Sequence, residues 1–202
     1  MPEGVKPEGT KPTVFVSHRL PGTAVDRMGE VADVVVAEGE QGLDDPRFAA
    51  RAGAIVALVT LLTARVDDAV LERCPRLRLV ANVAVGVDNI DVAACRRRGV
   101  LVTHTPGVLT EATADLTFAL LLAAARRVCE GDRYVREGRF AGFRPTLLLG
   151  VGLSGGVLGI VGLGRIGRAV AQRARGFGMR IVYTQRTRAP RAVEEALGAR
   201  YV

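Results

Sequence analysis

Over its first hundred or so residues the chain alternates between short β-branched apolar runs and amphipathic stretches. Apolar runs bounded by polar or glycine positions predict buried strands, and apolar residues at helical spacing predict helices between them. Strands alternating with helices predict a mostly parallel α/β sheet. The predicted strands are Thr13–Val16, Ala32–Ala37, Ala54–Val59, Leu77–Asn82 and Val100–Thr103. The predicted helices are Thr23–Val31, Pro46–Ala52, Asp67–Arg73 and Val92–Arg98.

A long helix is predicted at Thr110–Arg127, with Glu111 in its first turn and a basic pair at its end, as the helix dipole favours. Its centre, Leu116 to Ala125, is apolar on nearly every side, so we expect it to be covered all round, between two domains or across a subunit interface. A homodimer formed through this helix follows from that pattern. The Gly- and Arg-rich segment Gly131–Gly156 is interpreted as an arm between domains or subunits.

The N-terminal segment, the hydropathy pattern and the cysteine spacing indicate in which compartment the protein is expected. Residues 1–12 are rich in Pro, Gly, Lys and Glu and predict a flexible tail. No targeting segment and no apolar run able to span a bilayer is visible, so no membrane partner is expected. Cys74, Cys95 and Cys129 lie far apart, and they are expected to be buried thiols in a reducing compartment, which we take to be the cytoplasm.

A glycine-rich turn follows the apolar run Val157–Val161, with glycines at its first, third and sixth positions. The helix pattern Ala169–Phe177 and the strand pattern Arg180–Thr184 come next, which is the context of a Rossmann-type dinucleotide-binding unit. The first glycine permits the tight turn, the second lets the backbone approach a pyrophosphate, and the third lets helix and strand pack closely. A turn without a ligand is the alternative. The predicted cofactor-binding residues of the turn are Gly162, Leu163, Gly164, Arg165, Ile166 and Gly167.

The end of the second strand distinguishes the two nicotinamide cofactors. A site for NAD usually places Asp or Glu there to bind the ribose 2′-hydroxyl, whereas a 2′-phosphate requires cations and hydroxyls. This chain has Gln185, Arg186, Thr187 and Arg188. With no carboxylate and two guanidinium groups that can clamp a phosphate, these four residues favour NADP(H), and NAD(H) stays possible. Arginines that are merely solvated are the alternative.

The formal net charge of +7 lies in the same part of the chain. Residues 151–202 hold nine basic and two acidic residues, whereas residues 1–150 hold nineteen of each. A polyanionic ligand fits this distribution, and balancing acidic residues further along a longer chain would explain it equally well. Nucleic acid is disfavoured as a partner because the arginines are scattered through predicted helices with few aromatic residues between them.

Four blocks stand in the order and spacing of one family: Asn82–Val92, Thr105–Leu116, the glycine turn with its helix, and Tyr183–Arg188. From about Thr13 to its last residue the chain resembles the D-isomer-specific 2-hydroxyacid dehydrogenases, and within them the glyoxylate/hydroxypyruvate reductases. The resemblance implies a flavodoxin-like parallel-sheet substrate domain over residues 13–106. It also implies an incomplete Rossmann coenzyme domain over residues 107–202, which holds the long helix, the arm and the first part of the dinucleotide-binding unit.

The resemblance further implies that a small 2-keto acid, glyoxylate or hydroxypyruvate, is reduced to its 2-hydroxy acid by hydride from NADPH. By position, the backbone N–H groups of Val85 and Gly86 would hold the substrate carboxylate, and Thr113 would lie near the cofactor. An ordinary turn at the end of a strand is the alternative for Gly86. Capping and core packing are the alternative for Thr113.

No catalytic residue and no metal site is assigned in this chain. In the family a protonated histidine supplies the proton, an arginine orients the substrate and a carboxylate keeps the histidine charged, and all three belong to motifs later than Val202. The histidines of this chain, His18 and His104, are expected to be structural or surface residues. A non-catalytic nucleotide-binding or assembly module, or a truncated remnant, is therefore the alternative function.

Overall fold

The computed structural model describes residues 11–202, and the chain divides into two compact units between Pro106 and Gly107. Most of the predicted tail, residues 1–10, lies outside the described residues. The end of that tail is attached to the first unit, because Lys11 Nζ donates to the carbonyl of Gly29 at 2.8 Å. The Pro12 carbonyl also accepts from the N–H of Asp33 at 2.9 Å. The flexibility of the tail stays a prediction.

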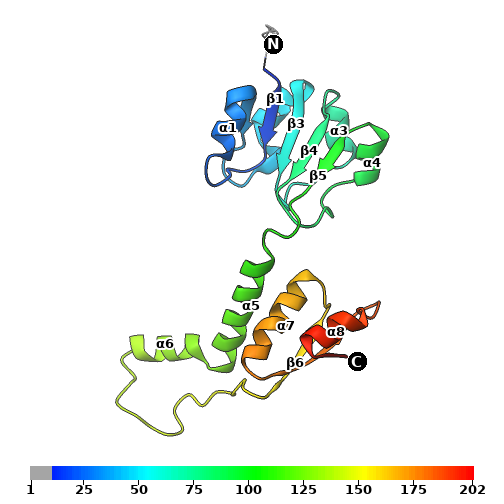
Figure 1. The fold of residues 1–202 in the computed structure, drawn as a ribbon. Helices are drawn as coiled ribbons and strands as arrows, with labels where there is room; N and C mark the ends of the chain where they lie inside the picture. The colour runs from blue at the N-terminus through cyan, green and yellow to red at the C-terminus, as the bar shows by residue number, and fades with distance from the viewer. Residues whose placement is uncertain (1–10) are drawn as a thin grey trace, which may run out of the picture. The chain divides into compact units, whose positions relative to one another are not determined.

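The first unit is built on a five-stranded parallel sheet with the order β2-β1-β3-β4-β5 (Figure 1). This is the flavodoxin-like order of doubly wound sheets. The strands are β1 (Thr13–Val16), β2 (Asp33–Val36), β3 (Ile55–Thr60), β4 (Leu79–Asn82) and β5 (Leu101–Thr103). The α-helices are α1 (Ala24–Val31), α2 (Pro46–Arg51), α3 (Asp68–Arg73) and α4 (Val92–Arg97), and two short 3₁₀ turns cover Gly42–Asp44 and Ala52–Ala54.

Burial of the apolar strands gives this unit its core. Phe15 of β1 and Phe48 of α2 are fully buried, with their rings edge to face at 5.2 Å between centroids. Ile55 and Leu58 of β3 and Val80 of β4 lie in the same cluster, also fully buried. Strands covered on both faces read as nearly continuous apolar runs, which is why the sequence pattern located all five of them.

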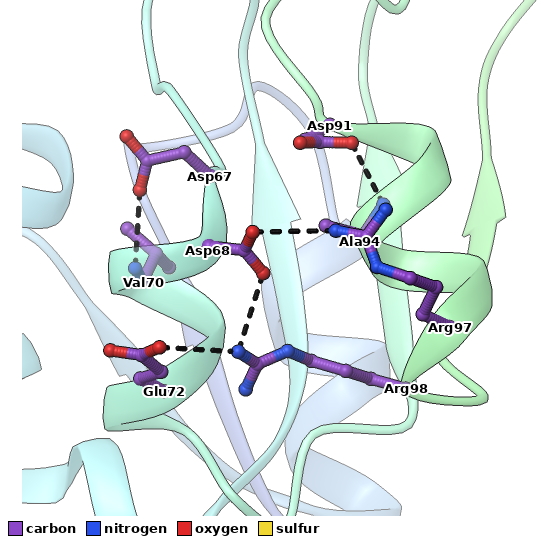
Figure 2. Close-up of polar contacts among 8 residues, drawn as sticks. All are labelled: Asp67, Asp68, Val70, Glu72, Asp91, Ala94, Arg97 and Arg98. Carbon is purple, nitrogen blue, oxygen red and sulfur yellow. Dashed lines mark hydrogen bonds and ion pairs between the residues drawn. The ribbon is translucent and has the colours of Figure 1, made fainter.

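Aspartates begin the two short helices α3 and α4 (Figure 2). Asp67 accepts a hydrogen bond from the N–H of Val70 at 3.2 Å, and Asp91 accepts one from Ala94 at 2.8 Å. Each carboxylate satisfies an N–H group that the first helical turn leaves without a partner. These caps fix where α3 and α4 begin at the surface of the sheet.

Ion pairs join the same two helices at the surface. Asp68 of α3 lies 3.3 Å from both Arg97 and Arg98, and Arg98 also approaches Glu72 at 3.5 Å (Figure 2). The side chains are half exposed, so each pair contributes no more than about 1 kcal/mol. The cluster is therefore a surface contact between α3 and α4.

The second unit holds a three-stranded parallel sheet with the order β6-β7-β8. Its elements are α5 (Thr110–Ala125), α6 (Val128–Arg136), β6 (Val157–Val161), α7 (Arg165–Gly176), β7 (Arg180–Thr184), α8 (Arg191–Leu197) and β8 (Ala199–Tyr201). Leu163, Ala171, Ile181 and Tyr183 are buried in its core. Phe118 of α5 stacks on Phe177 at 5.4 Å between ring centroids, so the long helix packs into the core of this unit.

Several predicted boundaries in the second unit are wrong. The long helix ends at Ala125 rather than Arg127, because Arg127 has the left-handed conformation, with φ of 55°, and a new helix follows. The predicted arm therefore begins inside α6, and irregular backbone starts only after Arg136. The helix after the glycine turn starts at Arg165, four residues earlier than predicted. The elements α8 and β8 were not predicted.

The long helix α5 is buried on one face only among the residues described. Ala114 and Phe118 are buried, whereas Leu116 and Leu120 are about 60 % exposed. Because this exposed face is apolar, the sequence predicted that the helix would be buried on all sides. Its burial by a second subunit stays a prediction.

The cysteines agree with the prediction in part. Cys74 and Cys95 are buried, and burial raises the pKa of the Cys74 thiol to about 11. Cys129 is exposed, contrary to the prediction, because it lies on α6, which has no buried residue. Between residues 11 and 202 no helix has the length and apolar character to cross a bilayer, and no group of three or more His, Cys, Asp or Glu side chains is placed to hold a metal ion.

Candidate functional site

The glycine turn joins β6 to α7 in the second unit. Gly162 has a φ of +95°, a region that favours glycine, and its N–H donates to the carbonyl of Thr184 at 2.8 Å. A Cβ on Gly167 would lie 2.3 Å from the Gly162 carbonyl oxygen. The first turn of α7 is therefore in direct contact with the end of β6, as expected for the first and third glycines of the motif.

Gly164 occupies the N-cap of α7 and borders open space. A Cβ added there would meet no atom within 4 Å. The N–H groups in the first turn of a helix have no acceptor four residues earlier, and here they belong to Arg165, Ile166 and Gly167. Open space next to unpaired donors at a helix N-terminus fits a pyrophosphate. The residues present therefore fit a dinucleotide.

Two other residues of the predicted site hold loops together. The side chain of Leu163 is 1 % exposed and belongs to the core. Its N–H donates to Gln185 Oε1 at 2.8 Å, and Gln185 Nε2 donates to the carbonyl of Thr187 at 2.6 Å. Gln185 thus ties the glycine turn to the loop that follows β7.

Arg186, Thr187 and Arg188 are exposed at the end of β7. Arg188 pairs with Glu194 of α8: its Nε and Nη2 donate to the carboxylate at 2.9 and 2.8 Å. This carboxylate was not predicted to belong to the site. Glu194 is 7 % exposed and also accepts the hydroxyl of Tyr183 at 2.6 Å. One of the two guanidinium groups expected to clamp a phosphate, that of Arg188, is therefore already paired with a carboxylate.

Charge and hydrogen bonding at this pair act on the pKa of Glu194. The Arg188 guanidinium first, and the Tyr183 hydroxyl second, lower the pKa of the Glu194 carboxyl from 4.5 to about 2. Donors bound to the ionised form favour that form. Glu194 is therefore a buried carboxylate that stays charged at neutral pH.

Thr113, the predicted neighbour of the cofactor, is half-buried in the first turn of α5, in the same unit as the glycine turn. Arg173 of α7 connects the two helices beside it. Its guanidinium contacts Glu111 at 3.0 Å and Asp115 at 2.7 Å, both on α5. Arg173 therefore fixes the start of α5 against the helix that begins at the glycine turn.

The first unit holds the predicted carboxylate cradle, in the loop after β4. Three consecutive carbonyls of this loop are bound: Ala84 by Thr105, Val85 by His104 Nδ1 at 2.8 Å, and Gly86 by Asn82 Nδ2 at 2.9 Å. Within residues 11–202 the N–H groups of Val85 and Gly86 find no acceptor. Two successive N–H groups without an acceptor are donors of the kind that an anion-binding turn uses.

Two hydrogen-bonded amides, one buried and one half-buried, support this loop. Asn82, 1 % exposed, accepts from the Thr60 hydroxyl at 2.9 Å and donates to Asn89 Oδ1 at 3.1 Å. Asn89 Nδ2 in turn donates to the carbonyls of Leu61 and Ala64 at 3.2 and 2.9 Å. The network joins the ends of β3 and β4 to the loop after β4. Its role was not predicted, although Asn82 and Asn89 stand inside one of the four family blocks.

The two histidines lie at the carboxyl end of the same sheet. His18 Nδ1 is 3.0 Å from the Ser17 hydroxyl, which accepts from the N–H of Leu61. His104 contacts the Val85 carbonyl, as described above, and is exposed. Both contacts support loops at this end of the sheet, and neither residue is assigned a proton-transfer role.

Known proteins match this chain over almost all of its length. The family described as D-isomer specific 2-hydroxyacid dehydrogenase, catalytic domain, matches residues 14–199. Glyoxylate reductases of Thermococcus litoralis and Pyrococcus furiosus are 46 % and 48 % identical, each over 95 % of this chain and 59 % and 58 % of their own.

Solved structures agree with these sequence matches. A protein from Thermus thermophilus is 48 % identical with a TM-score of 0.85, covering 94 % of this chain and 59 % of its own. The D-lactate dehydrogenase of Aquifex aeolicus, solved with NAD and lactic acid, is 25 % identical with a TM-score of 0.77, covering 94 % and 55 %.

Two parallel α/β units, one flavodoxin-like and one with a Rossmann-type glycine turn, define a protein of the Rossmann-like dehydrogenase class. Within that class, the chain belongs to the D-isomer specific 2-hydroxyacid dehydrogenase family, as the four sequence blocks predicted. It spans a little under three fifths of the length of the curated relatives it matches.

Proposed function

We propose that the protein reduces a small 2-keto acid, glyoxylate or hydroxypyruvate, with NADPH. The observation that carries the proposal is the cofactor side of the second unit. An open helix N-terminus at Gly164 lies one strand away from a loop that presents Arg186, Thr187 and Arg188. Helix N–H groups suit a pyrophosphate, and guanidinium groups suit a 2′-phosphate.

The assignments to the cofactor follow from these positions. The backbone from Gly164 to Gly167 would hold the pyrophosphate, and Arg186, with Thr187 and Arg188, would bind the 2′-phosphate. Thr113 would lie on the nicotinamide side. When bound, the cofactor supplies the hydride.

The substrate side rests on the loop after β4. The unpaired N–H groups of Val85 and Gly86 would bind the carboxylate of the 2-keto acid. Relatives that carry the name glyoxylate reductase support a small substrate. The proton donor is not assigned to any residue described.

A homodimer formed through α5 is part of the proposal. Leu116 and Leu120 are exposed on this helix, at positions one turn apart. An apolar helix face that neighbouring elements leave exposed is typical of an interface between subunits. In the proposed homodimer, Leu116 and Leu120 would be buried against a second copy of this chain.

Two measurements on the full-length protein test the proposed function. The first titrates NADPH and NADH and is expected to give tighter binding of NADPH. The second follows NADPH absorbance with glyoxylate and with hydroxypyruvate. Turnover with either acid supports the reductase, whereas NADPH binding without turnover supports the non-catalytic nucleotide-binding module. Absence of nucleotide binding, or a preference for NADH, contradicts the proposal.

A further inference from the structure

We propose that Glu194 is a positioning residue for cofactor selection, which orients Arg188 so that the outer edge of its guanidinium faces the 2′-phosphate. The inference rests on the proposed preference for NADP(H). It assigns a task to a residue of α8 that lies outside both the glycine turn and the loop after β7.

Arg188 and Glu194 form a bidentate ion pair. Arg188 Nε donates to Glu194 Oε1 and Arg188 Nη2 donates to Oε2, at 2.9 and 2.8 Å. The carboxylate is nearly buried, whereas 65 % of the Arg188 side chain is exposed. Two parallel hydrogen bonds fix the plane of a guanidinium as well as its position. In the part of the chain described, Nη1 has no acceptor, so the outward edge keeps its donors for a ligand.

The same carboxylate fixes the backbone of the loop. Glu194 accepts the Tyr183 hydroxyl, and that hydroxyl accepts the N–H of Ala189 at 3.0 Å. At the other end of the loop, the Tyr201 hydroxyl donates to the carbonyl of Gln185 at 3.1 Å. Residues 185–189 are therefore held at both ends before any ligand arrives, which lowers the ordering cost of binding.

Glu194 could affect the binding of a 2′-phosphorylated ligand in two opposite ways, through its charge or through its hold on Arg188. A negative charge near a phosphate weakens its binding, so removing that charge alone should make a 2′-phosphorylated ligand bind more tightly. If the task of Glu194 is to hold Arg188, removing the charge should make the same ligand bind less tightly. The sign of the change therefore separates the two effects.

The experiment compares E194Q with the full wild-type chain by calorimetry. The probes are adenosine 2′,5′-bisphosphate and AMP, which share the adenosine and the 5′-phosphate and differ in the 2′-phosphate. The amide that E194Q introduces cannot accept both guanidinium hydrogen bonds, because one of its two polar atoms is a donor. The matched control is E195Q, which removes the same charge from the next residue of α8, where Glu195 pairs with the exposed Arg191 at 2.7 Å.

We expect E194Q to weaken binding of the bisphosphate about tenfold, the equivalent of one charge-assisted hydrogen bond, and to leave the affinity for AMP unchanged. E195Q should leave both affinities unchanged. Equal or tighter binding of the bisphosphate by E194Q overturns the inference. Equal weakening of both probes also overturns it, because a general loss of structure does not distinguish the 2′-phosphate.

A double-mutant cycle tests whether Glu194 acts through Arg188. In the R188A background E194Q should change the bisphosphate affinity by less than about twofold, and a full tenfold effect there contradicts the inference. A wild-type chain that binds AMP as tightly as the bisphosphate overturns the proposed cofactor preference itself, and the inference with it. A wild-type preference for the bisphosphate with no effect of E194Q overturns the inference alone.

Discussion

At the scale of single residues, buried and half-buried polar side chains hold both candidate binding loops. Asn82 and Asn89 support the loop after β4, and Glu194 with Tyr183 supports the loop after β7. Each of these polar groups is bonded, and between residues 11 and 202 no buried side-chain polar atom lacks a partner. Breaking one bond in such a network leaves other buried groups unsatisfied, which costs more than the bond itself contributes.

Replacing Asn82 by Ala is expected to lower the free energy of unfolding by about 2 kcal/mol, since Thr60, Asn89 and the Gly86 carbonyl each lose a partner. Urea unfolding followed by circular dichroism measures the change. The control V83A replaces a neighbouring, 40 % exposed side chain and should change stability by less than about 0.5 kcal/mol. Equal stability of N82A and V83A would contradict the role of the network.

Ionised Glu194 should stabilise the folded chain, so part of the stability should be lost at acid pH. Its pKa in the folded chain is about 2, below the ordinary 4.5, so the folded state favours the ionised form. The stabilisation is present above the ordinary pKa and is lost as the pH falls from about 5 towards 2. The difference in unfolding free energy between wild type and E194Q should therefore be constant near neutral pH and should shrink over that acid range.

Urea titrations at several pH values measure this difference, with E195Q as the control. A difference between wild type and E194Q that stays constant down to the lowest pH would show that Glu194 carries no such coupling.

The sequence predicted those site residues whose role follows from local spacing. The glycine positions and the arginines after β7 stand within short motifs, so their neighbours along the chain define them. Glu194 was missed because its partners Tyr183 and Arg188 lie on other elements, and only the return of α8 towards β7 brings them together. The cradle role of Val85 and Gly86 came from the resemblance and stays a prediction.

At the scale of elements, the turn between β6 and α7 is constrained by close backbone contact. The glycines of the turn meet different surroundings, since a Cβ on Gly167 would collide with the backbone of Gly162, whereas one on Gly164 would enter open space. The backbone therefore requires glycine at Gly167, whereas at Gly164 only the proposed pyrophosphate would require it.

Gly167→Ala should cost about 1–3 kcal/mol of stability, because backbone must move to admit the methyl group. Gly164→Ala should cost less than about 1 kcal/mol and should still weaken NADPH binding, because its methyl group would occupy the space left for the pyrophosphate. Thermal unfolding and nucleotide titration of both variants measure these effects. A Gly164→Ala variant that binds NADPH like the wild type would place the pyrophosphate elsewhere.

Element boundaries were predicted best where burial produces a clear period. The seven predicted strands overlap the observed β1 to β7, since strands of a covered parallel sheet are nearly continuous apolar runs. The break at Arg127 was missed because a left-handed arginine has no local sequence signal. The helix α8 carries Pro190 at its N-cap and ends at Gly198 with φ of 63°, signals that were available and not used.

At the scale of the whole molecule, the exposed leucines of α5 predict assembly. If the chain forms a homodimer through this helix, L116E/L120E should change the sedimentation of the chain from dimer to monomer, because paired charges cannot be buried there without partners. The control L101E alters an exposed leucine of β5 in the first unit and should leave the dimer intact. A wild-type chain that sediments as a monomer contradicts the proposed dimer.

The central claim is that the second unit carries a dinucleotide site with a preference for the 2′-phosphate. The most direct test is the ratio of the NADPH and NADH dissociation constants of the wild-type chain, measured by fluorescence titration under one set of buffer conditions. We predict that NADPH binds at least about tenfold more tightly than NADH, the equivalent of one or two charge-assisted contacts to the phosphate. NADH binding that is equal or tighter would contradict it.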